Sequence, residues 1–479
     1  MISESPRFFY RKLVDGFPFT PTSEQDIALQ KLSHFITATD KGQLFVLKGF
    51  AGTGKTTIVG CVVKQLWHLK MKTMLLAPTG RAAKVMSGYS GTQSYTIHKK
   101  IYFPKKQSGG GVQFVLAPNK SRNTLFIVDE ASMIPDVPSD SKLFENGSLL
   151  DDLIQFVHSG HGCKLLLIGD TAQLPPVKLE LSPALAAEEL ELRYQLQVTQ
   201  MELQEVMRQN QHSGILFNAT GLREQLRGNF FEAFQFEDQG FQDIVRLRDG
   251  FEIQEAIDQA YTQVGKQETA IIVRSNKRAN LYNQNIRQRI LHLENEIAVG
   301  DFLMVVKNNY FWLSPSSRAG FIANGDIIEI LELFSIRELY GFKFAEVRVQ
   351  MVDYPDQKPF ETVLLLDTLH SASASLSYED GNQLYLEVAK DYAHEKSKYK
   401  RFLGVKNNRY FNALQVKFSY AITCHKSQGG QWDTVFVEQP FLTGSMDKEF
   451  LRWLYTAITR ARSQLYLIGF KDDFFVVNE

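Results

Sequence analysis

The residues from Gly49 to Thr57, GFAGTGKTT, constrain the fold of this chain more than any other stretch. They fit the pattern G-x-x-x-x-G-K-[ST] and directly follow the apolar run QLFVLKG (43–49), which predicts a buried strand. In this motif the glycines let backbone N–H groups close around phosphates, and the following helix adds positive potential at its N-terminus. Because a strand–loop–helix unit of this kind belongs to parallel α/β sheets, the motif predicts both a nucleotide site and the fold class.

Short apolar runs that alternate with helical patterns recur along the chain. Beyond residues 43–49 they are TMLLAPT (73–79), TLFIVDE (124–130), KLLLIGD (164–170), TAIIVRSN (269–276), YAIT (420–423), TVFVE (434–438) and QLYLIG (464–469). Continuous apolar strands that end in polar residues are typical of parallel sheets covered by helices on both faces. The sequence therefore predicts an α/β fold with two parallel sheets, the second of them interrupted.

Two stretches interrupt the sheets. Residues 299–414 are rich in strand-like segments and turns, including Asn324-Gly325, which is expected to form a hairpin turn, and they predict a small β-barrel. Within them, the helical stretch 382–404 carries its acids early and its bases late, which matches the helix dipole. It is either a solvated helix or a projecting arm with a basic tip. Residues 101–123 form two strand-like halves around a glycine-rich turn and predict a β-hairpin, with a mobile surface loop as the alternative.

Composition and charge exclude several classes of protein. The 479 residues are enough for about three domains, and 53 basic residues balance 53 acidic ones, so a polyanion site must be a local basic patch. Cys61, Cys163 and Cys424 form no CxxC pair, which argues against a disulfide framework or a zinc site and favours a reducing compartment. No apolar run approaches the roughly 18 residues of a membrane span, and no signal peptide is evident. We therefore expect a cytoplasmic protein without a membrane partner.

Polar side chains at the ends of the predicted strands supply the chemistry of a nucleotide hydrolase. Lys55 would hold the β- and γ-phosphates, and Thr56 would bind Mg²⁺. Asp129 would hold the metal through its shell, while Glu130 would orient or deprotonate the attacking water. Gln173 follows the third strand, where its amide can hydrogen-bond the γ-phosphate and the water. The further nucleotide contacts expected in the glycine-rich loop are Gly52, Thr53, Gly54 and Thr57.

The order of these motifs resembles that of the superfamily 1B DNA helicases of the RecD/Dda type, over nearly the whole chain. The segments that carry the resemblance are TSEQDIAL, LAPTGRAAKVM, YTIHKKI, LQEVMRQN, TCHKSQGGQW and LYTAITRARSQLYLIG, together with VGDFLMVVKNNY and IANGDIIEI, which resemble the family's SH3-like insertion. Each motif is moderately specific, and their common order is very specific. The resemblance implies an ATP-dependent 5′-to-3′ DNA helicase that moves on single-stranded DNA and separates duplex DNA.

The resemblance also implies roles for individual residues. Gln25 would read the adenine, and Arg208 and Arg460 would reach the ATP from the second sheet as arginine fingers. Gly430 and Gln431 would face the nucleotide, although family members often have Glu where this chain has Gln431, which leaves its ribose contact open. The residues expected to contact DNA are Pro78, Thr79, Arg81, Thr96, His98, Lys99, Thr423, His425 and Lys426.

The same resemblance predicts a division of the chain into four parts. They are RecA-like domain 1A at residues 1–100 and 124–195, a β-hairpin pin (1B) at 101–123, RecA-like domain 2A at 196–298 and 415–479, and an SH3-like barrel with a helical arm (2B) at 299–414. The pin would stand at the fork and separate the strands, with Phe103 and Phe114 pressing flat apolar surface on the last base pair.

The expected cofactors are ATP and Mg²⁺, and the expected partners are single-stranded and forked DNA. Single-strand-binding or replication and repair proteins are possible further partners, and the chain is expected to act as a monomer. Two alternatives stay open. An RNA helicase or remodelling translocase is one, because polarity and the preference for DNA rest on the resemblance alone. A non-hydrolysing, ATP-switched subunit of a nuclease complex is the other, against which the intact Glu130, Arg208 and Arg460 argue.

Overall fold

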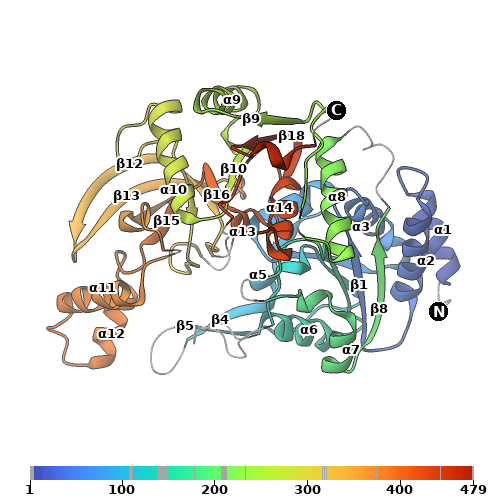
Figure 1. The fold of residues 1–479 in the computed structure, drawn as a ribbon. Coiled ribbons are helices and arrows are strands. Elements are labelled where there is room, and N and C mark those ends of the chain that lie inside the picture. The colour runs from blue at the N-terminus through green and yellow to red at the C-terminus, as the bar shows by residue number, and fades with distance from the viewer. Residues whose placement is uncertain are drawn as a thin grey trace.

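Two parallel sheets, a closed barrel and a hairpin form the framework of the protein (Figure 1). The computed structural model describes residues 5–106, 112–136, 148–176, 179–205, 213–231, 233–314, 317, 319, 321–373, 375–442 and 444–476. The predicted fold class, two RecA-like α/β sheets with a hairpin insertion and a barrel insertion, is confirmed. Within the described residues, no helix has the length and apolar character needed to cross a membrane.

The first sheet has the strand order β3-β2-β6-β7-β1-β8, with every pair parallel. Its strands are β1 (Gln43–Gly49), β2 (Lys72–Ala77), β3 (Ser94–Thr96), β6 (Thr124–Val128), β7 (Lys164–Gly169) and β8 (Gln197–Leu203). Alternate residues of β1 enter two different apolar cores, Phe45 and Leu47 on one face and Leu44 and Val46 on the other. Burial on both faces explains the continuous apolar runs of the sequence.

Seven helices of the described region accompany this sheet. They are α1 (Pro6–Asp15), α2 (Ser23–Thr37), α3 (Lys55–Gln65), α4 (Gly80–Ser90), α5 (Ile97–Ile101), α6 (Leu149–Ser159) and α7 (Ala187–Tyr194). The predicted boundary between the RecA-like domains at residues 195/196 is too early. Strand β8 lies beyond it and pairs with β1 along its whole length, so it belongs to the first sheet.

The second sheet has the strand order β16-β10-β17-β18-β9, again all parallel. Its strands are β9 (Ile244–Leu247), β10 (Thr269–Val273), β16 (Ala421–Thr423), β17 (Trp432–Glu438) and β18 (Ala461–Ile468). The helices are α8 (Gly214–Gly228), α9 (Gly250–Gln263), α10 (Asn276–Asn285), α13 (Cys424–Ser427) and α14 (Lys448–Ile458). In Figure 1, α13 and α14 lie between the two sheets, where they can contact both.

The barrel is inserted between β10 and β16 of the second sheet. It closes through β11 (Phe302–Val305), β12 (Ile327–Leu339), β13 (Phe342–Met351), β14 (Phe360–Leu365) and β15 (Leu414–Phe418). Because β15 closes the barrel, the barrel extends past the predicted end at residue 414. Asn324-Gly325 is a turn, with Gly325 at a φ of +99°, but it is not a hairpin turn. The residues on both sides of it, Ile322 and Ile327, pair with the same segment, 304–309.

The helical stretch predicted at 382–404 is two helices. They are α11 (Tyr378–Asp391) and α12 (Lys398–Lys406), and together they project from the barrel between β14 and β15 (Figure 1). The break is explained by Ser397, whose side chain accepts from the N–H of Lys400 and starts a new helix. The projecting-arm alternative is therefore the one that the fold supports.

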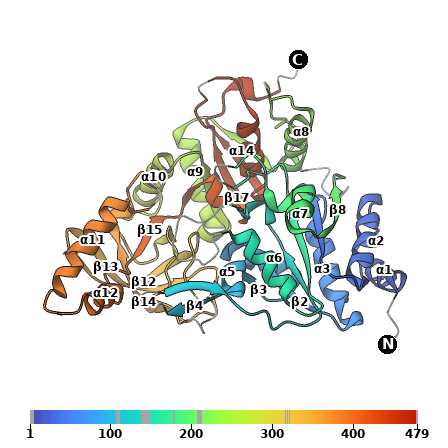
Figure 2. The ribbon, with the colours of Figure 1, turned by 90° about the horizontal axis from the view of Figure 1, so that it is seen from below.

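The predicted hairpin at 101–123 is confirmed as an antiparallel pair of strands. It consists of β4 (Tyr102–Lys106) and β5 (Val112–Leu116), while residues 107–111 lie outside the described residues. The hairpin leaves the first sheet directly after α5 and lies beside the barrel strands (Figure 2). A ring contact fixes this position, because the centroids of Phe114 and Tyr310 of the barrel segment are 4.2 Å apart.

Candidate nucleotide cleft and nucleic-acid interface

The glycine-rich loop between β1 and α3 has the backbone of a phosphate cradle. Gly52 and Gly54 have φ values of +77° and +86°, a region that favours glycine over residues with a Cβ. Lys55 Nζ donates to the carbonyls of Gly49 at 2.7 Å and Phe50 at 2.8 Å. Its ammonium group therefore lies over the loop, where a phosphate would offer it a stronger, charge-assisted hydrogen bond.

Gln25 connects helix α2 to this loop. Its Oε1 accepts from the N–H of Thr22 at 3.1 Å, which completes a capping box at the start of α2. Its Nε2 donates to the carbonyl of Thr53 at 3.0 Å, and the side chain is buried. The structure thus places Gln25 against the P-loop backbone, with both ends of its amide engaged by the chain. Adenine recognition by Gln25 stays a prediction.

Two acidic residues follow β6 at the edge of the cleft. Asp129 accepts from the hydroxyl of Tyr89 at 2.6 Å and from the N–H of Glu130 at 2.8 Å. Glu130 has a φ of +52°, a conformation that costs a residue with a side chain roughly 1–3 kcal/mol and that clusters at functional sites. Burial raises the pKa of Glu130, while the positive charges of Arg460 and Lys55 oppose that rise. A carboxylate with a raised pKa suits the role of a proton acceptor.

Arg460 reaches this carboxylate from the second sheet. It lies two residues beyond the end of α14 and is buried, with Nη1 4.0 Å from Glu130 Oε1. Its Nε donates to the carbonyl of Thr456 at 2.9 Å, and Nη1 donates to the carbonyl of Gly430 at 3.3 Å. The structure therefore brings together three predicted site residues, Arg460, Glu130 and Gly430. The other predicted finger, Arg208, lies outside the described residues.

Tyr455 is a residue of this cleft that the sequence reasoning missed. Its side chain is fully buried, and its hydroxyl donates to Asp170 at 2.7 Å and accepts from the N–H of Ala51 in the P-loop at 2.9 Å. Burial raises the pKa of Tyr455, so the phenol keeps the proton that it donates. The signal in the sequence was faint, a single phenol within the apolar run of α14. Through it, the second domain holds the P-loop and the end of β7 at once.

The loop after β7 is held by the second domain in the same way. The N–H of Leu174 donates to Thr456 Oγ1 at 2.9 Å, and its carbonyl accepts from Gln428 Nε2 at 2.6 Å. The neighbouring Gln173 is buried, and its Oε1 has no hydrogen-bond partner among the described residues. A buried orphan acceptor indicates a missing donor. An attacking water would be such a donor, which fits the role predicted for Gln173.

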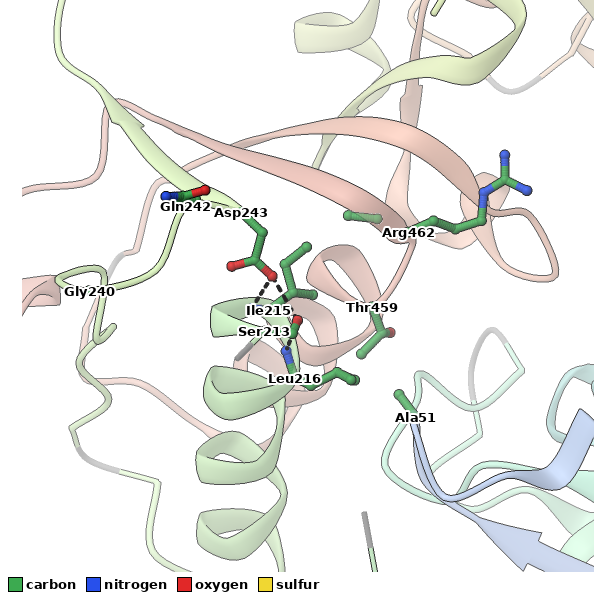
Figure 3. A pocket seen from close by; sticks show the side chains of 10 residues that line it. Ala51, Ser213, Ile215, Leu216, Gly240, Gln242, Asp243, Thr459 and Arg462 are labelled. Carbon is green, nitrogen blue, oxygen red and sulfur yellow. Dashed lines mark hydrogen bonds between the residues drawn. The ribbon is translucent and has the colours of Figure 1, made fainter. Parts of the chain in front are cut away.

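A pocket of about 610 Å³ opens beside the P-loop (Figure 3). Ala51 lines it from the first domain, and Ser213, Leu216, Asp243, Thr459 and Arg462 are among the residues that line it from the second. The carboxylate of Asp243 caps α8, accepting from the Ser213 hydroxyl at 2.7 Å and the Gly214 N–H at 2.8 Å. The volume lies within the range of small-molecule sites.

The residues present fit ATP and Mg²⁺. The glycine conformations of the loop and the lysine above it suit the phosphates of ATP, and the orphan oxygen of Gln173 suits a donor such as the attacking water. Asp129 offers the carboxylate oxygens that Mg²⁺ prefers, and Thr56 and Thr57 stand in the first turn of α3, next to Lys55.

The residues predicted to contact DNA lie where the two sheets meet the barrel. Arg81 stacks on Trp432, 4.3 Å from the ring centroid, and donates to the carbonyl of Gln431 at 3.3 Å. Lys99 Nζ donates to the carbonyl of Ser317 at 3.2 Å, and Lys426 Nζ donates to the side chain of Asn324. The structure thus joins parts of the sequence that lie up to 350 residues apart into one interface.

Other predicted DNA contacts have structural tasks in this interface. Pro78 and Thr79 connect β2 to α4, and the hydroxyl of Thr79 caps α4 by accepting from Ala82 N–H. Thr96 caps α5 through Lys99 N–H, and Thr423 precedes α13 as its N-cap residue. Burial lowers the pKa of His98 to about 4, so it carries no charge near neutral pH. His425 is more exposed than His98, and desolvation lowers its pKa as well.

The two aromatic residues predicted to face the fork point away from each other. Phe103 is opposite Val115 in the hairpin and Phe114 is opposite Pro104, so the two rings lie on different faces of the ribbon. Phe103 is 41% exposed, whereas Phe114 is 8% exposed and packs on Tyr310. The prediction that Phe114 presents a flat surface to the last base pair is therefore wrong. Its ring anchors the hairpin to the barrel instead.

Comparisons with known proteins agree with these observations. The model of an AAA domain matches residues 22–240, and that of the UvrD-like helicase C-terminal domain matches residues 418–468. An uncharacterised protein of Acanthamoeba polyphaga mimivirus is 23% identical over 511 residues, which cover 92% of this chain and 98% of the relative. The ATP-dependent DNA helicase Dda of Enterobacteria phage T4 is 24% identical over 480 residues, 92% of this chain and 96% of the relative.

A shorter match and a structural likeness complete the comparison. The RecD2 DNA helicase of Deinococcus radiodurans is 35% identical over 136 residues, 28% of this chain and 16% of the relative. Among solved structures, the Pif1 helicase from Bacteroides in complex with ADP-AlF3 and ssDNA has a TM-score of 0.47 at 14% identity, covering 96% of this chain and 95% of that chain. The family matches and the full-length relatives agree with the order of the motifs, and on these grounds the chain is similar to the superfamily 1B helicases of the RecD/Dda type.

Proposed function

We propose that the protein is an ATP-dependent DNA helicase that moves 5′-to-3′ on a single strand and separates duplex DNA. The observation that carries this proposal is the position of Arg460, a second-domain cation 4.0 Å from Glu130 of the first domain. The residues that hold the phosphates and those that stabilise the reaction therefore belong to different domains. Hydrolysis then requires the two domains to close on the nucleotide. Loss of the products allows them to separate, so each turnover can move one domain relative to the other.

Each residue of the cleft has a task in this reaction. When bound, ATP would supply the phosphoanhydride bond whose hydrolysis releases free energy, and Mg²⁺ would neutralise charge on its phosphates. Lys55 holds the phosphates, Asp129 and Thr56 hold the metal, and Glu130 accepts a proton from the attacking water. Arg460 stabilises the negative charge that develops on the transferred phosphoryl group, an effect worth roughly 10³–10⁵ in rate for such fingers.

A short path links the cleft to the strand. Gln428 holds the carbonyl of Leu174 in the loop after β7, and it directly follows α13. That helix carries His425 and Lys426, which are the residues proposed to contact DNA. Loss of the γ-phosphate beside Gln173 can thus alter the position of His425 and Lys426 through the contact between Leu174 and Gln428. Two domains that grip the strand alternately would move along it.

DNA is the favoured polymer, and the cytoplasm the favoured compartment. Dda of phage T4 and RecD2 of Deinococcus radiodurans are both DNA helicases by name, which supports DNA over RNA for this chain. The 5′-to-3′ polarity is proposed from the family. Three free cysteines, two of them buried, support a reducing compartment.

Unwinding of two matched substrates tests the proposal. One duplex carries only a 5′ single-stranded tail and the other only a 3′ tail. With ATP and Mg²⁺ the protein is expected to unwind the 5′-tailed duplex, and Lys55→Ala is expected to unwind neither. Lys48→Ala is the matched control, because Lys48 lies on β1, just before the P-loop, and its Nζ donates to Gln200 at the protein surface.

Three outcomes would contradict parts of the proposal. Unwinding of the 3′-tailed duplex alone would reverse the polarity. Stronger stimulation of ATP turnover by RNA than by DNA would favour the RNA translocase. ATP binding by the lone chain without turnover, with DNA present, would favour the non-hydrolysing subunit.

A further inference from the structure

A second pocket lies at the root of the hairpin, on the first domain. Its volume is about 510 Å³, and four basic residues line it, Lys72, Lys100, Lys120 and Arg122. The other lining residues are apolar or neutral, and no Asp or Glu is among them. Such a concentration of one charge stands out in a chain whose net charge is zero.

The four cations have no counter-charge among the residues that the structure describes. Among the described residues, none of their side chains forms an ion pair or a hydrogen bond, whereas Arg193, on the same domain, pairs with two aspartates. Lys100 is partly buried, and this burial lowers its pKa. Like charges gathered around one hollow repel one another. An anionic ligand would remove that repulsion.

The pocket is separate from both the nucleotide cleft and the interface that carries the predicted DNA contacts, which we call the DNA groove. Lys72 begins β2, while the predicted DNA contacts Pro78 and Thr79 follow its other end. At about 3.3 Å per residue this six-residue strand holds the two regions roughly 20 Å apart. Helix α5 makes the same division, because Lys99 bonds to Ser317 near the barrel whereas Lys100 lines the pocket.

The hairpin lies at this boundary. Its two ends meet at the pocket, where the N–H of Ala117 donates to the carbonyl of Ile101 at 2.7 Å. The segment that returns from the hairpin to β6 carries Lys120 and Arg122, both exposed. If the hairpin parts the two strands, the displaced strand would leave the hairpin on a side other than the groove. The pocket offers a cationic surface at the hairpin root.

We propose that this pocket binds the sugar-phosphate backbone of the displaced strand, the one that does not run through the groove between the domains. The inference rests on the proposed function, because it takes the hairpin to be the element that parts the strands. By holding the displaced strand, the pocket would oppose its return to the duplex. Contacts to phosphates alone would read no sequence.

Forks that differ only in the displaced tail test this proposal. All carry the same 5′ tail for tracking, and the displaced strand ends in a natural DNA tail, in a tail of uncharged methylphosphonate linkages, or in no tail. The wild-type protein is expected to unwind the first fork several-fold faster than the other two. The double variant Lys120→Glu/Arg122→Glu is expected to lose this preference.

The controls separate loss of the contact from loss of the fold. Both substituted side chains are exposed, so the variant should keep the wild-type ATP turnover with single-stranded DNA and the wild-type rate on the fork without a tail. Lys41→Glu/Lys64→Glu changes the charge equally at two exposed positions of the same domain outside the pocket, and it should keep the preference.

Binding measurements give an independent readout. Each phosphate contact to a single strand contributes about 0.7 to the slope of log affinity against log salt. For the natural-tail fork, two lost contacts should lower this slope by about 1.4, and the uncharged tail should show no such change. A photo-crosslinking base in the natural tail should label the peptide that spans residues 117–124.

Several results would overturn the proposal. Equal wild-type rates on the charged and uncharged tails would show that the backbone charge is not read. If the variant lost the same rate on the fork without a tail, the pocket would act on the duplex and not on the displaced strand. If the wild-type protein unwound no fork, the proposed function would fail, while labelling of residues other than 117–124 would reject the pocket separately.

Discussion

Replacing Tyr455 with phenylalanine deletes one oxygen atom from the cleft and keeps the buried ring. That oxygen makes two hydrogen bonds between the domains, to the N–H of Ala51 at 2.9 Å and to the carboxylate of Asp170 at 2.7 Å. A hydrogen bond between neutral groups contributes about 0.5–1.5 kcal/mol, and one to a charged group about 1.5–3 kcal/mol. The substitution should therefore destabilise the closed cleft by roughly 2–4.5 kcal/mol.

This loss should appear as weaker ATP binding. If both bonds exist only when the domains are together, a loss of about 2 kcal/mol shifts the equilibrium towards the open cleft by roughly 30-fold. Because the closed cleft is the form that holds ATP from both sides, the apparent Kd for ATP should rise at least about tenfold. Saturating ATP should restore closure, so kcat should stay within about threefold of the wild-type value.

A nucleotide titration and steady-state kinetics measure the two effects. Tyr466→Phe is the matched control, because this partly exposed phenol stacks on Phe436 and has no hydrogen bond among the described residues. It should behave as the wild type. An unchanged KM with a reduced kcat for Tyr455→Phe would refute the reasoning, since it would place the phenol in the chemical step and not in domain closure.

Four further variants test the site and the hairpin. Lys55→Ala should abolish ATP turnover with the fold intact in circular dichroism, and wild-type turnover would reject the phosphate site. Arg460→Ala should bind ATP but turn it over at least about 10²-fold more slowly, because it acts on the transition state; an equal loss in binding would mark a ground-state contact. His425→Ala/Lys426→Ala should raise the DNA concentration needed to stimulate turnover and leave basal turnover unchanged, which a DNA titration checks. Phe114→Ala should lose roughly 3–5 kcal/mol of packing and speed hydrogen exchange in the hairpin, so that unwinding falls while DNA-stimulated turnover persists.

The sequence predicted the strands that are buried on both faces. The runs at 43–49, 124–130 and 164–170 are continuous and apolar because helices cover both sides of the first sheet. Strand β8 escaped prediction because it is an edge strand, and its residues Gln197–Leu203 are mostly half-exposed and mixed in polarity. The placement of the domain boundary failed for the same reason.

The candidate site was predictable where one segment carries the chemistry. The P-loop, Asp129 and Glu130 each follow a recognisable strand. Tyr455 was not predictable in this way, because its partners lie 404 and 285 residues away and only the meeting of two domains reveals them. Phe114 was misplaced because its face depends on which residue opposes it across the hairpin, and the sequence leaves that register open.

The barrel touches three of the cations that are proposed to grip DNA. Arg81 lies 3.7 Å from Asp353, Lys99 bonds to Ser317, and Lys426 bonds to Asn324. These oxygen atoms contact the same cationic groups that the phosphates of a DNA strand would contact. A DNA strand that binds there would therefore displace these oxygen atoms. Each displacement would remove one contact between the barrel and the RecA-like domains. DNA binding would then release the barrel from the RecA-like domains, so that the barrel could move relative to them only when a strand is bound.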